Sequence, residues 1–206
     1  DLMIPQRALM GGWAMGIPAL YLLISSSREK SMRQTVLLAL WAGALPLVHT
    51  HTFLALGLFS GGYILGRLIV QKEERSGILV RAGVYLSIVL VLALPQVLGN
   101  AVRQTLEGGS LRFQFNWVNN SGGRGFKDGY FWFWVKNAGL PFILVVCACL
   151  NAGRRGHLDL VLGMTAIYAV AETILFQPNE YDNNKLFYVA FIAMLPMAGR
   201  YLTKLW

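Results

Sequence analysis

The stretch TVLLALWAGALPLVHTHTFLALGLFSGGYILGRLIV, residues 35–70, decides the fold of this chain. It is too long for a single membrane-spanning helix, which needs roughly 20 apolar residues, and it is short for two complete spans. Pro46 and the polar run His49–Thr52 interrupt it near its middle. We therefore expect a helical hairpin whose turn lies at this interruption.

The first arm of this hairpin is short for a membrane. About 14 residues at 1.5 Å each cover only about 21 Å of a roughly 30 Å hydrocarbon core. His49, Thr50, His51 and Thr52 should therefore lie below the outer surface, in a protein-lined or watery recess, because lipid cannot satisfy their polar groups. In the second arm, GGYILG (Gly61–Gly66) provides a small-residue face for close helix packing.

The whole chain has the composition of a membrane protein. Of its 206 residues 55% are hydrophobic and only 14% are charged, and long apolar runs in lipid can satisfy their backbones only as helices. The predicted fold is an all-α, polytopic transmembrane helix bundle of about seven spans, with one long outer loop that carries an interfacial helix. The spans are expected at about 8–25, 35–48, 52–70, 78–98, 131–150, 158–175 and 186–203. Whether 35–48 and 131–150 cross fully or lie partly at the interface stays open.

Lysine and arginine define the orientation of these spans. Eleven of the eighteen basic residues fall in alternate connections or at the end of the chain, and the positive-inside rule makes that side cytoplasmic. They are Arg28, Lys30, Arg33, Arg67, Lys72, Arg75, Arg81, Arg154, Arg155, Arg200 and Lys204. The same rule accounts for the net charge of +8, so nucleic acid is not an expected partner. The expected location is a plasma membrane, that of a bacterium, and the expected chemistry faces outward.

The chain is expected to be one transmembrane domain, residues 1–206, and a piece of a longer protein. It begins with Asp1 rather than methionine, and no signal-peptide pattern precedes the first span. The oligomeric state is not predictable from the sequence.

His49 and His51 have three interpretations. A His-x-His pair can cap a tight turn, hydrogen-bond a polar substrate, or ligate a metal. No third ligand lies at a characteristic spacing. Substrate contact is therefore the favoured functional interpretation, no cofactor is expected, and a divalent metal is left open.

Two further candidates are ionisable residues at membrane depth. Lys136 and Asn137 follow the aromatic run Tyr130–Trp134, which is typical of a membrane interface. Lys136 would either extend to water or meet an anionic group such as a lipid-borne phosphate. Glu172 lies near the outer end of a predicted span, where a carboxylate is costly and marks either a site or a structural ion pair.

The segment LFQPNEYDNNKLF, residues 175–187, carries more polar groups than capping one helix requires. Asp182, Asn183 and Asn184 precede the last span, and Lys185 follows them. Free amides at a helix start together with Lys185 would form an anion site on the outer side, and a solvated turn is the alternative.

Four motifs together resemble the C-terminal part of polytopic glycosyltransferases of the GT-C superfamily, including mannosyltransferase-like proteins that use polyprenyl-phosphate sugars. They are PQRALMGG, HTHTF, FWFWVKNAGLP and FQPNEYDNNKLF. The resemblance implies a multi-span bundle, an outward-facing active site, a lipid-phosphate-linked sugar donor and an inverting displacement. The acidic catalytic motif of the superfamily has no counterpart here, so the catalytic residues are unknown.

Under this resemblance Lys136, Lys185 and Arg124 would hold the lipid phosphate, and His49, His51 and Glu172 would line the sugar pocket. The full set of predicted substrate-binding residues is His49, His51, Lys136, Asn137, Glu172, Asp182, Asn183 and Lys185. The expected partners are the bilayer and the lipid-linked donor. The alternatives are a secondary transporter, with Glu172, His49 and His51 as an ion or proton site, and a non-catalytic membrane protein.

Overall fold

The computed structural model describes residues 7–102, 111–120, 125–154, 157–176 and 183–206. Within them the chain forms eight α-helices, two short strands and three short helical turns. The helices are α1 (Arg7–Arg28), α2 (Met32–Ala44), α3 (Thr50–Val70), α4 (Arg75–Gln96), α6 (Tyr130–Ala138), α7 (Leu140–Arg154), α8 (Leu158–Thr173) and α9 (Asn184–Leu205). The strands are β1 (Arg112–Phe113) and β2 (Ile174–Leu175), and the turns are η1 (Leu45–Leu47), η2 (Lys72–Glu74) and η3 (Val97–Val102). The helical character of all seven predicted segments is confirmed.

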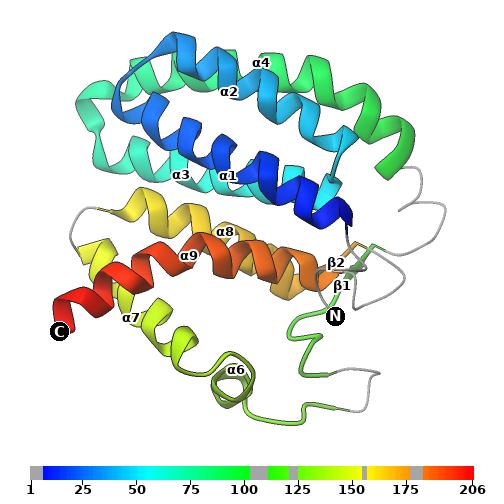
Figure 1. Cartoon of the computed structure of the whole chain (residues 1–206), viewed down its shortest axis with the longest axis vertical. Coiled ribbons are helices and arrows are strands. Elements are labelled where there is room, and N and C mark those ends of the chain that lie inside the picture. The colour runs from blue at the N-terminus through cyan, green and yellow to red at the C-terminus, as the bar shows by residue number, and fades with distance from the viewer. Residues whose placement is uncertain (1–6, 103–110, 121–124, 155–156, 177–182) are drawn as a thin grey trace.

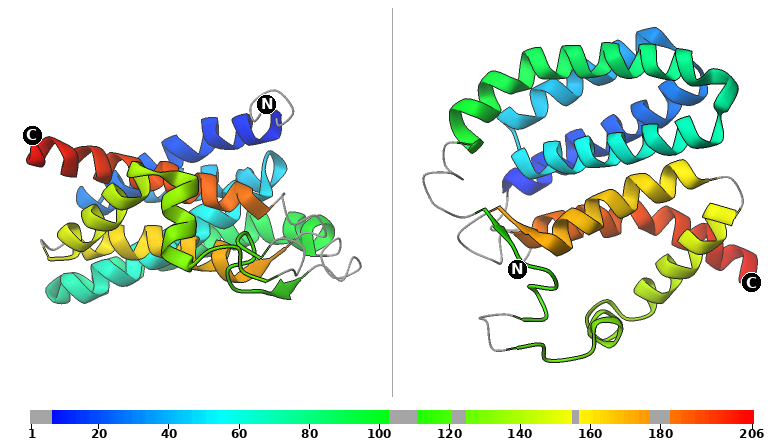
Figure 2. Two further views of the ribbon diagram at one scale, coloured as in Figure 1. Left: turned by 90° about the horizontal axis from the view of Figure 1, so that it is seen from below. Right: turned by 180° about the vertical axis from the view of Figure 1, so that it is seen from behind.

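The long helices lie side by side and run back and forth between two ends of the molecule (Figure 1; Figure 2). The contacts connect them in the order α4, α2, α1, α3, α8, α9, α7. One end, which we call the basic end, holds the last turns of α1, α3 and α9, the first turns of α4 and α8, and the C-terminus. The other, the loop end, holds the α2–α3 connection, β1, β2 and the start of α9.

Fewer of the described helices than predicted are long and apolar enough to span a membrane by themselves. Four helical segments are long and apolar enough to cross a membrane: Leu9–Arg28, Thr50–Val70, Lys72–Gly99 and Asn184–Leu205. A fifth exists if α6 and α7 together make one bent span. The remaining two, α2 with 13 residues and α8 with 16, fall short of a roughly 30 Å core at 1.5 Å per residue. The predicted seven spans are thus not confirmed, although the chain keeps a multi-pass membrane architecture.

The segment predicted as one helix at 131–150 is broken. α6 and α7 meet at an angle of 117°. Gly139 between them has a φ of 65°, a left-handed conformation that glycine adopts without steric cost. Pro141 follows in the first turn of α7, where its missing N–H is tolerated. The sequence AGLP therefore ends one helix and starts the next in a new direction.

The predicted hairpin is present as two consecutive helices, but its arms do not pair closely. α2 packs mainly against α4 and α1, whereas α3 packs mainly against α8. η1, which contains Pro46, turns the chain between the arms. Ser31 starts α2 by accepting a hydrogen bond from the Gln34 backbone N–H at 3.3 Å.

α3 and α8 form the closest long-range contact of the fold, and glycines make it. A Cβ added to Gly62 would lie 2.3 Å from the Leu162 carbonyl oxygen, and one added to Gly66 would lie 2.3 Å from the Asp159 Cα. In the same way, a Cβ added to Gly163 of α8 would lie in close contact with Phe59 of α3. The prediction of a small-residue packing face in GGYILG is confirmed, but Gly61 takes no part in it because a Cβ there would meet nothing within 4 Å.

The outer faces of the helices are apolar. Large hydrophobic side chains are exposed along α4, including Leu79, Val80, Leu86, Leu90 and Val91. A contiguous exposed face of this kind is rare in water-soluble monomers and suits contact with lipid. These faces are consistent with an integral membrane protein.

Candidate functional site

Glu172, in the last turn of α8, is the most unusual polar residue at the loop end. Its side chain is 3% exposed, and both carboxyl oxygens are buried without a hydrogen-bond partner among the described residues. A buried polar group that lacks a partner costs about 1–3 kcal/mol, and a charged one costs more. A carboxylate held in this way is a candidate for binding a ligand or a proton.

The chain between β1 and Asn120 lies along the end of α8 that carries Glu172. β1 pairs with β2 in antiparallel register, Arg112 opposite Leu175 and Phe113 opposite Ile174. The backbone N–H of Asn116 then donates to the Glu172 carbonyl oxygen at 3.0 Å, and the Trp117 indole N–H donates to the Ala171 carbonyl oxygen at 2.8 Å. The segment is thereby fixed along the end of α8, where free carbonyls need donors.

Asn116 itself adds polar atoms to the site. It is 3% exposed, its φ is 55°, and its side-chain carbonyl oxygen is buried without a partner in the described part of the chain. A left-handed asparagine in a tight turn is tolerated locally. The unsatisfied oxygen places a second acceptor in the same region.

Two tyrosine hydroxyls lie within electrostatic range of Glu172. The Tyr168 and Tyr130 hydroxyl oxygens are 2.9 Å apart, and the Glu172 carboxylate acts on both. Tyr168 precedes Glu172 by four residues, so both occupy the same face of α8. The site thus combines an acceptor carboxylate with hydroxyl donors.

An aromatic cluster forms the wall behind these tyrosines. Trp134 of α6 is 5% exposed and its ring centroid lies 5.0 Å from Phe187, 5.7 Å from Tyr168 and 5.8 Å from Phe191. Its indole N–H is buried and interacts with the Tyr130 hydroxyl, but it makes no hydrogen bond of good geometry among the described residues. The predicted aromatic belt is therefore divided: Phe131 and Trp132 are exposed, while Trp134 joins the core. Flat aromatic faces beside polar groups suit a sugar ring or another compact polar ligand.

His49 belongs to a second group of residues at the loop end. It is the N-cap of α3, is 7% exposed, and its Nδ1 accepts from the Thr52 backbone N–H at 3.2 Å and lies 2.8 Å from the Thr52 hydroxyl. Burial first, and the nearby Lys185 ammonium second, lower the pKa of His49 to about 4. His49 is thus a neutral acceptor at physiological pH. Its Nδ1 is engaged in capping α3.

α1 passes very close to this cap. A Cβ added to Gly12 would lie 2.6 Å from the Thr52 hydroxyl and 2.8 Å from His49 Nδ1, and one added to Gly16 would lie 2.7 Å from Thr52 Cγ2. The two glycines are four residues apart, the spacing that lets helices approach closely. The His51 ring is partly exposed and lies 5.6 Å from the His49 ring.

Lys136 and Asn137 have partners of their own. The Lys136 ammonium donates to both Asp128 carboxylate oxygens, at 2.9 and 3.0 Å, and its side chain is 51% exposed. The Asn137 amide donates to the Phe133 carbonyl oxygen of its own helix at 2.8 Å. Lys136 was predicted either to extend to water or to contact a phosphate. Its ion pair with Asp128 was not predicted.

Asn183 is one of the three residues, Asp182 to Asn184, that could cap the last helix. It occupies the N-cap position without a side-chain cap hydrogen bond, and its Oδ1 accepts from the Phe176 backbone N–H at 2.7 Å. This hydrogen bond links the residue after β2 to the start of α9. Asp182, which was also predicted to bind substrate, lies outside the described residues, as does Arg124.

The described part of the chain contains no group of three or more histidine, cysteine or acidic side chains that could hold a metal ion. Glu172 was among the predicted site residues. Asn116, Tyr130 and Tyr168, which lie around it, were not predicted as site residues. Only Tyr168 left a usable signal, its four-residue spacing from Glu172.

No protein-family profile, no curated protein and no solved structure matches the chain. What defines its class is therefore its own geometry: a multi-pass bundle of apolar helices with a buried carboxylate at the loop end that has no hydrogen-bond partner in the described part of the chain.

Proposed function

We propose that the chain is a portion of an integral membrane glycosyltransferase of the GT-C type, which uses a lipid-phosphate-linked sugar at the outer face of a bacterial plasma membrane. The loop end is its outward side, because most of the described lysine and arginine residues belong to helix ends and connections of the opposite end, among them Arg28, Lys72 and Arg200. The resemblance of the four motifs motivates the proposal, and the geometry at Glu172 supports it.

The observation that carries the proposal is the pair of Glu172 carboxyl oxygens, which have no hydrogen-bond partner among the described residues and lie within electrostatic range of two tyrosine hydroxyls backed by an aromatic wall. Sugar hydroxyls donate to a carboxylate and pack their C–H faces on aromatic rings. A site built to hydrogen-bond such a ligand leaves its polar groups unsatisfied when the ligand is absent. Glu172 is assigned to sugar binding rather than to catalysis.

The donor phosphate is assigned to Lys185, in the first turn of α9, whose ammonium lies within electrostatic range of His49. The start of a helix and a lysine both favour an anion. Lys136 would contribute only if the phosphate displaced Asp128 from its ammonium. His51 and Asp182 remain predicted contacts.

The proposal is tested with the complete protein, reconstituted into liposomes with polyprenyl-phosphate sugars of several kinds. Release of polyprenyl phosphate is the readout, because it does not depend on which acceptor is used. Lys185→Ala should weaken donor binding about tenfold or more, since hydrogen bonds to charged groups contribute about 1.5–3 kcal/mol. Glu172→Gln should reduce turnover, whereas Glu73→Gln, the same change at an exposed position of the basic end, should not. Absence of turnover with every donor would refute the proposal.

A secondary transporter is the second candidate, and one observation favours it. α8 unwinds into β2 directly after Glu172, and helices broken near a carboxylate are typical of transporter ion sites. A pH-sensitive dye inside the same liposomes separates the two functions. Solute-driven proton flux that Glu172→Gln abolishes, without any release of polyprenyl phosphate, would establish transport instead.

A further inference from the structure

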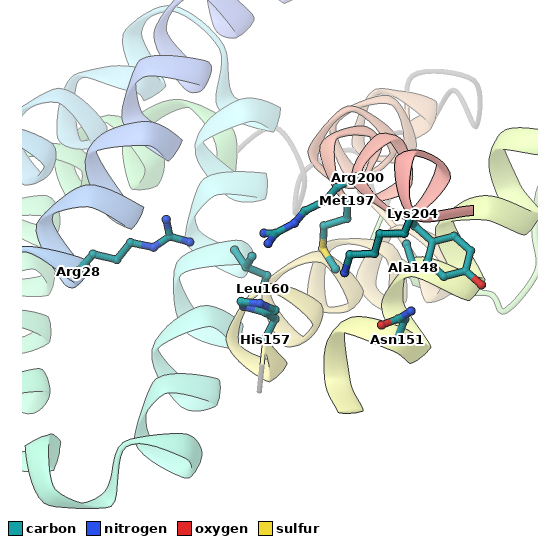
Figure 3. A pocket seen from close by; sticks show the side chains of 9 residues that line it. Arg28, Ala148, Asn151, His157, Leu160, Met197, Arg200 and Lys204 are labelled. Carbon is teal, nitrogen blue, oxygen red and sulfur yellow. The ribbon is translucent and has the colours of Figure 1, made fainter. Parts of the chain in front are cut away.

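A hollow lined by basic side chains lies at the basic end, opposite the Glu172 site. Its volume is about 70 Å³, against the roughly 10–15 Å³ that one water molecule needs. The polar side chains that line it are Arg28, Asn151, His157, Arg200, Tyr201 and Lys204. They come from α1, α7, α8 and α9, so the hollow is created by the fold rather than by one stretch of sequence (Figure 3).

The charged groups converge on this hollow. Figure 3 shows the Arg28 and Arg200 guanidinium groups extending toward each other from opposite sides, with His157 close to Arg200 and Lys204 on the side of Arg200 away from Arg28. Asn151 and Tyr201 add neutral groups that can donate hydrogen bonds. None of the lining residues in the described part of the chain is acidic.

Three of the described carboxylates nearest this end of the chain are engaged elsewhere, and Glu73 is exposed in η2, outside the hollow. Asp159 pairs with Arg67 of α3 at 3.9 Å, Glu74 pairs with Lys30, and Glu29 accepts from the Gln34 amide at 2.7 Å. Like charges that face one another across a hollow repel unless an anion lies between them. The positive-inside rule explains why basic residues occur at this end, but it does not explain why they surround one space.

We propose that this hollow binds a phosphate group, with Arg28 and Arg200 as its main ligands. Guanidinium groups bind phosphate oxygens through two parallel hydrogen bonds, and basic pockets between helices on the cytoplasmic side suit lipid headgroups. Met197 and Leu160 line the same hollow, and an apolar wall beside the charges suits a lipid more than free phosphate. The inference does not depend on the proposed function, because it concerns the opposite end of the molecule.

The test uses the complete protein in a neutral detergent. Binding of short-chain phosphatidylglycerol, short-chain phosphatidylcholine and inorganic phosphate is measured separately by native mass spectrometry and by the shift of the thermal unfolding midpoint. We expect one tightly held phosphatidylglycerol per chain and no comparable binding of phosphatidylcholine. If inorganic phosphate binds as tightly and displaces the lipid, the source of the phosphate is soluble.

The variant Arg28→Gln/Arg200→Gln should weaken binding of the anionic probe at least tenfold. Arg33→Gln/Lys72→Gln removes the same charge from exposed positions of the same end outside the hollow, and it should leave binding within about twofold. Arg28 and Arg200 are exposed, so circular dichroism should show an unchanged fold. Equal loss of binding in both double variants would show that charge at the surface, and not this hollow, holds the anion, and failure of every anionic probe to bind the unchanged protein would also overturn the proposal.

Discussion

Gly62 of α3 lies so close to Leu162 of α8 that a Cβ added to Gly62 would stand 2.3 Å from the Leu162 carbonyl oxygen and 2.6 Å from its carbonyl carbon. Contacts of this kind involve backbone, which cannot move aside as a flexible side chain can. The position of α8, and with it the position of Glu172, therefore depends on a residue that has no side chain.

We expect Gly62→Ala to destabilise the protein by about 1–3 kcal/mol or more, the usual cost of overpacking. Gly61→Ala is the matched control, since a Cβ at that neighbouring position meets nothing within 4 Å. Replacing glycine by alanine in a helix without steric conflict stabilises it by about 0.5–1 kcal/mol. The two variants should thus shift the thermal unfolding midpoint in opposite directions, and shifts of the same sign would contradict the α3–α8 contact.

The orientation of the bundle is tested by cysteine labelling. In a background with Cys147 and Cys149 replaced by alanine, single cysteines are introduced at Phe113 in β1 and at Ser76 in the first turn of α4, both exposed. An impermeant maleimide added to intact cells should label position 113 only, because the positive-inside rule puts the basic end in the cytoplasm. Labelling of position 76 from outside would reverse the orientation and place the Glu172 site on the cytoplasmic side.

The helices were predictable because their signals are local. Apolar runs, prolines and capping residues lie within each segment, so all seven segments appear as helices. The break at Gly139 also had a local signal, a glycine two residues before Pro141, but the surrounding apolar run concealed it. The number of spans was not predictable from composition, since an apolar helix as short as α8 can be buried against α3 instead of crossing alone.

The site was predictable only in part, for a related reason. Glu172 could be identified because a carboxylate in an apolar run is costly wherever it lies. The residues around it could not, since Asn116 and Tyr130 are more than 40 residues away in sequence and meet Glu172 only through the strand pair and the turn of α6. Lys136 was predicted to be available for a phosphate because its partner, Asp128, lies in a loop with no regular spacing.

His49 makes stability depend on pH. The pKa of His49 is lowered to about 4 in the folded protein, chiefly by burial and then by Lys185, against an ordinary value of 6.5. Between these values the unfolded chain binds the additional proton, so His49 contributes its full share of stability above about pH 6.5 and loses it as the pH falls toward 4. We expect the thermal unfolding midpoint to fall across this range, and to fall less in His49→Asn, which keeps an N-cap acceptor but does not titrate.

Ser31→Ala provides the control for this measurement. It removes the N-cap acceptor of a different helix, α2, and involves no titratable group, so it should lower the midpoint without changing the slope of midpoint against pH. An unchanged slope in His49→Asn would mean that other groups produce the dependence.

The last prediction concerns the cost of keeping Glu172 without a partner. Glu172→Leu removes a buried carboxylate whose two oxygens have no hydrogen-bond donor among the described residues, and it keeps much of the side-chain volume. We expect this variant to be more stable than the unchanged protein, by about 1–3 kcal/mol, while donor turnover is lost.

Asn119→Leu is the control for this prediction. Asn119 is also buried, but its side-chain amide donates to the Asp128 carbonyl oxygen at 2.7 Å and accepts from the Asp128 backbone N–H at 3.2 Å. That variant should be destabilised, since it removes two formed hydrogen bonds and leaves two backbone groups unsatisfied. If Glu172→Leu instead unfolds as readily as Asn119→Leu, the carboxylate has a structural partner, and its assignment to ligand binding is wrong.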